Sequence, residues 1–355
     1  MKIVVLHGEM LQGAPEDEID GWIQAQAVGG ALRQLGYDAT LMAFSENIEA
    51  NVSALMSQRP ELVFNLVETL GGTGRWIHVA PVVLDRLGIA YTGCGAQSLM
   101  LSSNKLLAKN RLFQTGIPTP ELVTEESITS VNGSGPVQCM IKSVWEHGSV
   151  GLYDDAVLQV MHPKDLMDAM KTKRMQMGGE CFAERYIEGR EFNVSMLARP
   201  WDESVQILPV AEIRFMEYPE NRHRIVCYKA KWDEDSFEYH HTQRSFDHAP
   251  EDQELIECMK ALALSCWRLF DLQGYGRVDF RVDGDGKPWV LEINSNPCIT
   301  PDSGFVVAAQ RAGLAYPDII ERIVGDALVR RDREELSSVL VQKWVTNASE
   351  RLAIS

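Results

Sequence analysis

The sequence has no long hydrophobic run and no N-terminal leader pattern. No stretch approaches 18 consecutive apolar residues, so we expect no membrane-spanning helix. The apolar run Met1–Leu6 is too short for a secretory signal, and His7-Gly8-Glu9 stands where a cleavage site of small residues would be. These features favour a cytoplasmic protein whose first strand begins at Lys2.

The sequence also lacks a paired cysteine motif and has fewer basic than acidic residues. Its 7 cysteines are odd in number and never form Cys-x-x-Cys, which favours reduced thiols over a disulfide framework or a zinc site. Lys and Arg number 34 against 50 Asp and Glu, a formal net charge of −16. Such an acidic chain repels nucleic acid and anionic membranes, so neither is an expected partner. An anionic ligand would need a local cluster of cations.

Composition and patterning indicate a globular α/β protein of two or three domains. The chain has 355 residues, 45% hydrophobic and 24% charged. In the first hundred residues, short apolar runs alternate with helical spacing, which predicts a parallel sheet with helices on both faces. The expected strands are Lys2–His7, Ala39–Phe44, Leu62–Leu66 and Gly88–Gly93, and the expected helices include Trp22–Leu35 and Trp76–Leu87.

After Ser103 the pattern changes to strands joined by glycine turns, which predicts two α+β subdomains. We place the domains at 1–103, 104–187 and 188–355. Tyr228–Phe246 is polar and rich in aromatics, and we expect a lid-like loop there. The expected strands are Val137–Lys142, Cys181–Ile187, Glu191–Leu197, Gln206–Phe215, Gly276–Val282 and Trp289–Asn294. The expected helices are Asn104–Thr115, Pro163–Met177, Glu251–Phe270, Val306–Ala312 and the tail Arg330–Leu352.

The most informative segment is a predicted β-hairpin late in the chain. Asp285-Gly286 between alternating apolar residues is typical of a two-residue type I′ turn. With that turn, Asp279 lies directly opposite Glu292, and Arg277 lies opposite Asn294, all on one face. The alternate residues, which would then face a hydrophobic core, are Trp289, Leu291 and Ile293.

Two carboxylates this close repel each other unless something compensates their charge. A divalent cation would do so, since Asp279, Glu292 and Asn294 offer the oxygen donors that Mg²⁺ prefers. Alternatively, Arg277 and Arg281 neutralise a polar face that is open to solvent. The following amide and hydroxyl groups of Asn294-Ser295-Asn296 favour the metal site, because they extend the same polar surface.

Cations and a glycine loop precede this hairpin. Lys105 opens a predicted helix, and Lys142 ends an apolar strand shortly before Gly148-Ser149-Val150-Gly151. Backbone N–H groups of such a loop can cradle phosphate oxygens while an ammonium group supplies charge. The alternative is a plain turn, because the loop matches no established phosphate-binding motif.

Glu184 is an acidic residue within an apolar strand. An unpaired carboxylate there would be costly to bury. We expect Glu184 to accept a hydrogen bond from a ligand or to pair with a nearby lysine. The alternative is a surface pair with Arg185 or Arg190.

Taken together, these motifs resemble the ATP-grasp superfamily, and within it the D-alanine–D-alanine ligases. The likeness runs from Lys2 to Ala312 and is specific from Asn104 to Ser303. The motifs that carry it, in chain order, are Lys105, Lys142, the glycine loop, Glu184 with Gly189 and Glu191, Ala230-Lys231-Trp232, Gly274-Tyr275-Gly276-Arg277-Val278-Asp279, and Leu291-Glu292-Ile293-Asn294-Ser295-Asn296-Pro297.

The resemblance implies an enzyme that phosphorylates one carboxylate with ATP and then lets an amine attack it. The residues implied for ATP are Lys105, Lys142, Gly148, Ser149, Glu184, Arg185, Tyr186, Ile187, Glu191 and Lys231. Those implied for two Mg²⁺ ions, which Mn²⁺ can replace, are Asp279, Glu292 and Asn294. Those implied for catalysis and for the substrates are Arg277, Ser149, Glu18, Cys298 and Ser303.

The sequence departs from the ligase pattern near the expected substrate sites. Glu68-Thr69-Leu70-Gly71 stands where the ligases have a His-Gly motif, and Cys298 replaces a glycine. The leading interpretation is therefore a carboxylate–amine ligase that joins two amino acids, and we expect a homodimer. A ligase with a larger peptide or metabolite acceptor is the second, and a nucleotide-binding module without activity is the third. The complete set of implied ATP and metal residues argues against the third.

Overall fold

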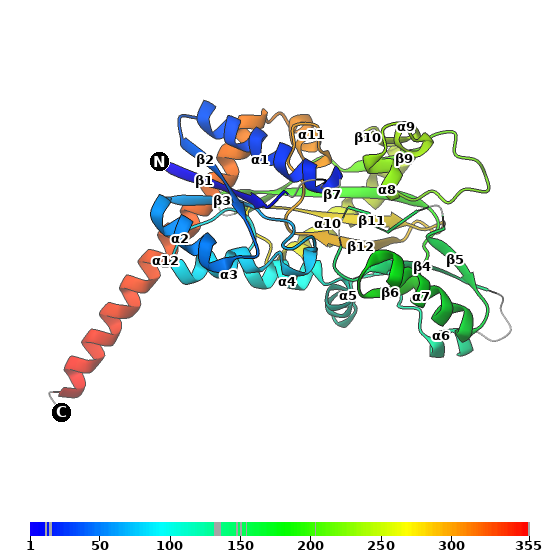
Figure 1. Ribbon diagram of the computed structural model, residues 1–355, viewed down its shortest axis with the longest axis horizontal. Helices are drawn as coiled ribbons and strands as arrows, with labels where there is room; N and C mark the ends of the chain where they lie inside the picture. The colour runs from blue at the N-terminus through cyan, green and yellow to red at the C-terminus, as the bar shows by residue number, and fades with distance from the viewer. Residues whose placement is uncertain are drawn as a thin grey trace.

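The structure is a computed structural model that describes residues 1–10, 13, 16–130, 136–146, 148, 149, 151–153, 155–202 and 204–353, without the side chains of 17, 18, 130, 334, 335 and 337–353. Within these residues the chain forms three sheets, and helices cover them (Figure 1). Each sheet falls inside one of the three predicted domain ranges, whose boundaries stay a prediction. None of the described helices is long and apolar enough to cross a membrane.

The first sheet is parallel and has helices on both faces, as the sequence predicts. Its strand order is β2-β1-β3. Ile3 and Val5 of β1 pack under the first helix, whereas Val4 and Leu6 point to the opposite face, because successive strand residues alternate. The elements are β1 (Lys2–Gly8), α1 (Glu16–Gln34), β2 (Asp38–Phe44), α2 (Ile48–Gln58) and β3 (Leu62–Leu66).

The end of the first domain differs from the prediction in two places. The predicted helix Trp76–Leu87 is divided into η1 (Gly74–Trp76) and α3 (Val79–Leu87). The predicted strand Gly88–Gly93 is only an isolated bridge between Tyr91 and Val63. Gly88 and Gly93 have φ angles of 65° and 79°, and this left-handed backbone cannot continue a strand.

The second sheet is antiparallel, with strand order β5-β4-β6. The predicted helix Pro163–Met177 is present as α7 and packs on this sheet. The predicted strand Cys181–Ile187 is shorter and ends at Arg185. The elements of this part are α4 (Ala96–Ser103), α5 (Lys105–Gln114), α6 (Glu125–Ser130), β4 (Val137–Ser143), β5 (Val157–Val160), α7 (Pro163–Met177) and β6 (Cys181–Arg185).

The third sheet is antiparallel, with strand order β10-β9-β7-β11-β12 and β8 paired to β7. The predicted strand Gln206–Phe215 is divided between β8 and β9 around Leu208, which is buried. The predicted loop Tyr228–Phe246 instead holds two short helices and a strand. The elements are β7 (Arg190–Arg199), β8 (Ser204–Ile207), β9 (Ala211–Phe215), α8 (Tyr228–Trp232), α9 (Phe237–His241), β10 (Thr242–Ser245), η2 (Pro250–Asp252), α10 (Gln253–Leu269), β11 (Tyr275–Val282), β12 (Pro288–Asn294) and α11 (Gly304–Arg311).

The last helix, α12 (Tyr316–Ala353), packs against elements from the start of the chain. Ile319, Ile320 and Ile323 are fully buried in the core that β1 and α1 form. Beyond this packed part, the helix extends away from the rest of the molecule (Figure 1). The predicted helical tail is therefore present, as the end of a longer helix that begins in a hydrophobic core.

Candidate active site

A cavity of about 610 Å³ is lined by residues from all three sheets. Gly8 and Leu66 come from the first sheet, Lys142 and Glu184 from the second, and Glu292 from the third. Most of the predicted site residues gather here, but Lys105 is not in the lining. Of the ATP, metal and substrate sets, those in the lining are Lys142, Gly148, Ser149, Glu184, Arg185, Tyr186, Ile187, Glu191, Lys231, Arg277, Asp279, Glu292, Asn294, Cys298 and Ser303.

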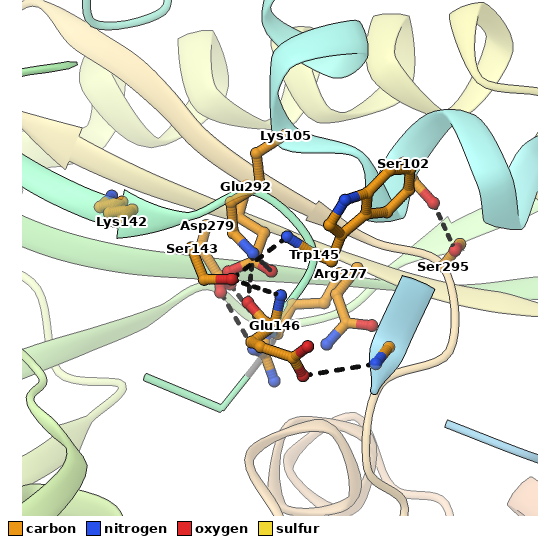
Figure 2. Close-up of polar contacts among 12 residues, drawn as sticks. Ser102, Lys105, Lys142, Ser143, Trp145, Glu146, Arg277, Asp279, Glu292 and Ser295 are labelled. Atoms are coloured by element: carbon orange, nitrogen blue, oxygen red, sulfur yellow. Dashed lines mark hydrogen bonds and ion pairs between the residues drawn. The ribbon is translucent and has the colours of Figure 1, made fainter. Parts of the chain in front are cut away.

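The predicted pairing of the β11–β12 hairpin is confirmed at its functional end. Asp279 pairs with Glu292, and Arg277 pairs with Asn294. All four line the cavity. Figure 2 shows Asp279 and Glu292 side by side, with Lys105 pointing toward them, and its ammonium lies 3.6 Å from Glu292 Oε1. Two carboxylates and an amide oxygen therefore face one space from adjacent strands.

The predicted turn of this hairpin is wrong. Asp283 N donates to Lys287 O at 3.1 Å, so three residues form the loop, with Gly286 at a φ of 78°. The Asp283 carboxylate favours this loop, because it accepts hydrogen bonds from the backbone N–H groups of Asp285 and Lys287. Three-residue loops of this kind shift the pairing by one residue relative to a type I′ turn.

A bulge restores the predicted pairing farther along the hairpin. Phe280 pairs with Val290 and Asp279 with Glu292, so Leu291 is an extra residue on β12. The prediction that Trp289 and Leu291 face the core is consequently wrong. Val290 is fully buried there, whereas Leu291 lines the cavity. The core side chain predicted correctly is Ile293.

Arg277 holds the Asp279 carboxylate with two hydrogen bonds. Its Nε and Nη2 donate to Oδ1 and Oδ2 at 2.7 and 2.9 Å, and Asn193 Nδ2 also donates to Oδ1 at 2.7 Å. Burial disfavours the guanidinium charge, but Asp279 and Glu292 outweigh it and raise the pKa of Arg277. Asn193 on β7 was not predicted as a site residue, because only the sheet places that strand beside β11.

Glu184 forms ion pairs with two lysines. Its Oε1 lies 2.5 Å from Lys142 Nζ, and its Oε2 lies 2.6 Å from Lys109 Nζ. Burial disfavours the charged carboxylate, but the two ammonium groups outweigh it and lower the pKa of Glu184. The predicted pairing with a lysine is therefore confirmed, and the surface pair with Arg185 or Arg190 is wrong.

Arg281 does not neutralise Asp279 as the alternative interpretation required. Its guanidinium is buried and donates to Glu191 Oε2 at 3.1 Å and to Tyr186 Oη at 3.2 Å. Burial raises the pKa of Glu191, and Arg281 opposes that shift. Arg281 thus fixes Glu191 and Tyr186, two of the residues predicted to contact ATP, at one wall of the cavity.

The glycine loop is held by contacts on both sides. Ser149 has a φ of 64°, and its Oγ donates to Val226 O at 2.7 Å. Trp232 Nε1 donates to Gly148 O at 3.0 Å, so α8 covers the loop. Lys105 Nζ donates to Glu146 O. Of this predicted motif, 150 lies outside the described residues.

Glu146 connects this loop to the first domain. Its carboxylate accepts from Thr73 Oγ1 at 2.8 Å and from Gly74 N at 3.3 Å. The polar tail of the hairpin makes a similar connection. Ser295 Oγ lies 2.6 Å from Ser102 Oγ, and Asn296 Nδ2 donates to Val67 O. Contrary to expectation, these two buried residues join domains and are not part of the cavity lining.

The expected substrate residues lie at one end of the cavity. Ser303 caps α11, and its Oγ accepts from Val306 N at 3.4 Å. Cys298 Sγ donates to Asp20 Oδ2 at 3.2 Å, and burial raises the pKa of its thiol. Asp20 was not predicted, and it also lines the cavity. The side chain of Glu18 lies outside the described residues.

Lys231 and Arg244 add positive charge to the same region. Burial, reinforced by Arg277, lowers the pKa of both side chains. The sequence predicted Lys231 and missed Arg244, which follows an ordinary polar run and has no motif around it. Nor did it single out Lys109, although this lysine lies one helical turn after Lys105 and shares its side of α5.

Comparisons with known proteins define the class to which this fold and site belong. A family model described as the D-ala D-ala ligase C-terminus matches residues 119–325. The D-alanine–D-alanine ligase of Bordetella avium is 27% identical over 92% of this chain and 94% of its own. An uncharacterised protein of Sinorhizobium fredii is 28% identical over 84% of this chain and 86% of its own.

Two solved structures share the fold. The D-alanine–D-alanine ligase of Bacillus anthracis complexed with ATP is 20% identical and aligns with a TM-score of 0.67 over 94% of this chain and 99% of that one. The ligase from Coxiella burnetii is 17% identical, with a TM-score of 0.68 over 98% and 99% of the two chains. The chain therefore belongs to the D-alanine–D-alanine ligase family, and it is an ATP-grasp ligase that depends on ATP.

Proposed function

We propose that the protein joins two amino acids through an acyl-phosphate intermediate, using ATP and Mg²⁺, with D-alanine as the first candidate substrate. One observation carries the proposal. Asp279 faces Glu292 in a cavity that also holds Lys142, Lys231 and Arg277. Paired carboxylates with several cations suit phosphoryl transfer, which needs positioning and charge neutralisation and no nucleophilic side chain.

Residues of the cavity would bind ATP along one wall. Lys105 and Lys142 would hold the α- and β-phosphates under the loop at Gly148 and Ser149, and Lys231 would meet the γ-phosphate. The adenine would lie against Glu184 and the backbone from Arg185 to Ile187, and Glu191 would accept from the ribose hydroxyls. Support comes from the burial of Glu184 and the partial burial of Glu191 beside these cations, and from the Bacillus anthracis ligase solved with ATP.

The donor set at the hairpin fits magnesium. Asp279 and Glu292 offer carboxylate oxygens from facing strands, and Asn294 can add an amide oxygen. In this proposal they hold two Mg²⁺ ions, and Mn²⁺ would substitute. When bound, these ions neutralise the negative charge of the phosphates during transfer.

The chemistry proceeds in two steps. An oxygen of the first substrate's carboxylate attacks the γ-phosphorus, the bond to the β-phosphate oxygen breaks, and ADP leaves. The neutral amine of the second substrate then attacks the acyl carbon, loses a proton, and expels inorganic phosphate. Arg277 stabilises the oxyanion of this second step through its planar set of N–H donors. Glu18 and Ser149 would position the first substrate, and Cys298 would narrow the acceptor pocket. Ser303 would donate a hydrogen bond from its hydroxyl to the second substrate's carboxylate.

A larger acceptor is the second candidate. The observation that favours it is that Glu68 and Thr69, from the segment that stands where the ligases have a His-Gly motif, line the cavity. A homodimer and a cytoplasmic location also belong to this proposal.

The test is an assay of ADP release by the purified chain with ATP, Mg²⁺ and single amino acids or pairs of amino acids. The proposal expects ADP, phosphate and an amide of matching mass in equal amounts. ADP release without any new amide, or an amide found only with a peptide acceptor, would replace the first candidate by the second. No ADP release with any carboxylate would overturn both.

A further inference from the structure

Arg244 lies in the cavity, yet the proposed chemistry gives it no role. It belongs to β10, where it pairs with Ile213 of β9, and it lines the cavity together with Ser303. Its guanidinium covers Gly304, the first residue of α11. A methyl group added to Gly304 would come within 3.1 Å of Arg244 Nη2. The guanidinium therefore lies directly beside the residue proposed to bind the second substrate.

The positive charge of Arg244 is not matched by an ion pair within the part of the chain that the structure describes. Partial desolvation and the neighbouring Arg277 lower the pKa of Arg244, Asp302 offsets that shift incompletely, and the side chain stays exposed to solvent. Arg214 on β9 makes the contrast clear, because its Nε lies 3.4 Å from Glu212 Oε2. An arginine that lines a cavity next to a second arginine, without a carboxylate partner, favours an anionic ligand.

Three other cations of the cavity lining have carboxylate partners, and Arg185 belongs to the part of the lining proposed for the adenine. Lys142 pairs with Glu184, Arg277 with Asp279, and Arg281 with Glu191. Lys231 is the cation proposed for the γ-phosphate. Arg244 is thus the cation left for a substrate anion at the α11 end. A guanidinium presents a planar fork of donors that matches a carboxylate.

We propose that Arg244 binds the carboxylate of the amine substrate, beside Ser303, and thereby restricts the acceptor to amines that carry a carboxylate. The inference rests on the proposed function and deepens it by naming the group that selects the acceptor. Arg244 contacts the substrate away from the reacting atoms, so it sets specificity and takes no part in phosphoryl transfer.

The experiment compares an acceptor with and without its carboxylate. D-alanine serves as the donor, and D-alanine or D-alaninamide serves as the acceptor probe; the amide lacks the carboxylate to be activated, so it acts only as an acceptor. Where D-alanine is not used, the amino acid that the wild type does use replaces it, again with its carboxamide. The readout is the ratio of kcat/KM for the two acceptors.

The wild type is expected to prefer the carboxylate acceptor by about 10²-fold, the worth of a charge-assisted pair of hydrogen bonds. In Arg244→Gln the ratio should fall to within about 10-fold of unity, with Arg244→Lys in between. Arg214→Gln, which removes an arginine from the adjacent strand outside the cavity lining, should keep the wild-type ratio. Because the readout is a ratio, a loss of folded protein does not change it.

Hydroxylamine trapping of the acyl-phosphate separates the two proposals. Arg244→Gln should form the donor hydroxamate at the wild-type rate, because this step precedes use of the acceptor. A variant that traps normally and keeps the full carboxylate preference would overturn the role of Arg244 and leave the ligase proposal intact. A wild type that forms neither hydroxamate nor amide with any amino acid would overturn the ligase proposal and, with it, this inference.

Discussion

Glu184 and Lys109 form a buried ion pair of 2.6 Å that joins β6 to α5, and Lys142 of β4 approaches the same carboxylate from the other side. Glu184 is only 2% exposed and Lys109 only 4% exposed. Lys109 is also held by Thr119 Oγ1 and Pro120 O, at 2.9 and 2.7 Å. This cluster holds Lys142 at the cavity wall. The negative charge of Glu184 compensates the repulsion between the ammonium groups of Lys142 and Lys109.

Glu184→Gln should destabilise the protein. Removing one member of a buried ion pair leaves charge without compensation and costs about 3–5 kcal/mol. The midpoint of urea unfolding should fall accordingly. Glu180→Gln is the control, because Glu180 is 53% exposed and pairs with Arg75 at 4.0 Å, so its effect should stay below about 1 kcal/mol. Equal effects of the two substitutions would contradict the importance of the cluster.

Glu184 should also make the stability of the folded protein depend on pH below neutrality. Its pKa is lower in the folded protein than in the unfolded chain, where it has the ordinary value near 4.5. The unfolded state therefore binds the proton first as the pH falls below that value, and stability is lost as the pH falls through the lowered folded pKa. Urea midpoints measured from pH 6 down to pH 3 should show this loss in the wild type. In Glu184→Gln the loss should be smaller, and an unchanged slope would exclude Glu184 as its source.

Glu292→Gln should abolish ATP turnover while the fold survives. The substitution keeps the size of the side chain but removes half of the facing carboxylate pair proposed for Mg²⁺. ADP release at ordinary Mg²⁺ should fall by at least about 10²-fold, and the melting temperature should hardly change. Glu257→Gln on the exposed side of α10, where it pairs with Lys260, should turn over normally. Normal ADP release by Glu292→Gln would contradict the proposal that Glu292 binds Mg²⁺.

Asp279→Ala should behave differently from Glu292→Gln. Removing one of two facing carboxylates relieves their repulsion, and this effect alone would spare the fold. Asp279, however, accepts two hydrogen bonds from Arg277 and one from Asn193. Its loss leaves a buried guanidinium without its partner, so Asp279→Ala should lower the melting temperature as well as turnover. Comparison of the two melting curves checks this, and an unshifted Asp279→Ala curve would contradict it.

Lys142→Ala should weaken ATP binding. Lys142 lines the cavity beside Glu184, whereas Lys171 lies on the exposed face of α7. The Kd for ATP, measured by titration calorimetry with Mg²⁺ present, should rise by at least about tenfold in Lys142→Ala, about 1.4 kcal/mol. Lys171→Ala should leave it unchanged. Small and equal effects of the two substitutions would indicate that Lys142 does not bind ATP and has only a structural role.

Arg277→Lys should impair amide formation far more than ATP binding. Lysine retains the charge but cannot copy the two-donor geometry that arginine offers to an oxyanion. Loss of such stabilisation is typically worth about 10²–10³ in rate. If Arg277 only neutralises Asp279, amide yield will change little, and the Mg²⁺ concentration needed for half-maximal rate will shift instead. Measuring both quantities in this one variant decides between the two roles.

The sequence by itself determined the parts of this protein whose physics is local. Apolar residues at strand or helix spacing identified β1, β2 and β3 and the helices between them, because both periods can be recognised within a short stretch of sequence. The pairing of Asp279 with Glu292 was also predicted correctly, but only because two errors cancelled: the loop is one residue longer than predicted, and an unpredicted bulge follows it. The Asp283 side chain selected a three-residue loop, and the extra residue Leu291 restored the register.

Only the tertiary structure decided which distant residues meet in the cavity. Lys109 and Glu184 are far apart in the chain, and no local pattern reports that α5 packs where it does. Asn193 and Arg244 become site residues because β7 and β10 share a sheet with the hairpin. Pairings of this kind arise when the hydrophobic faces of separate elements are buried together, and that energy depends on the whole arrangement of the chain and not on the residues next to each side chain.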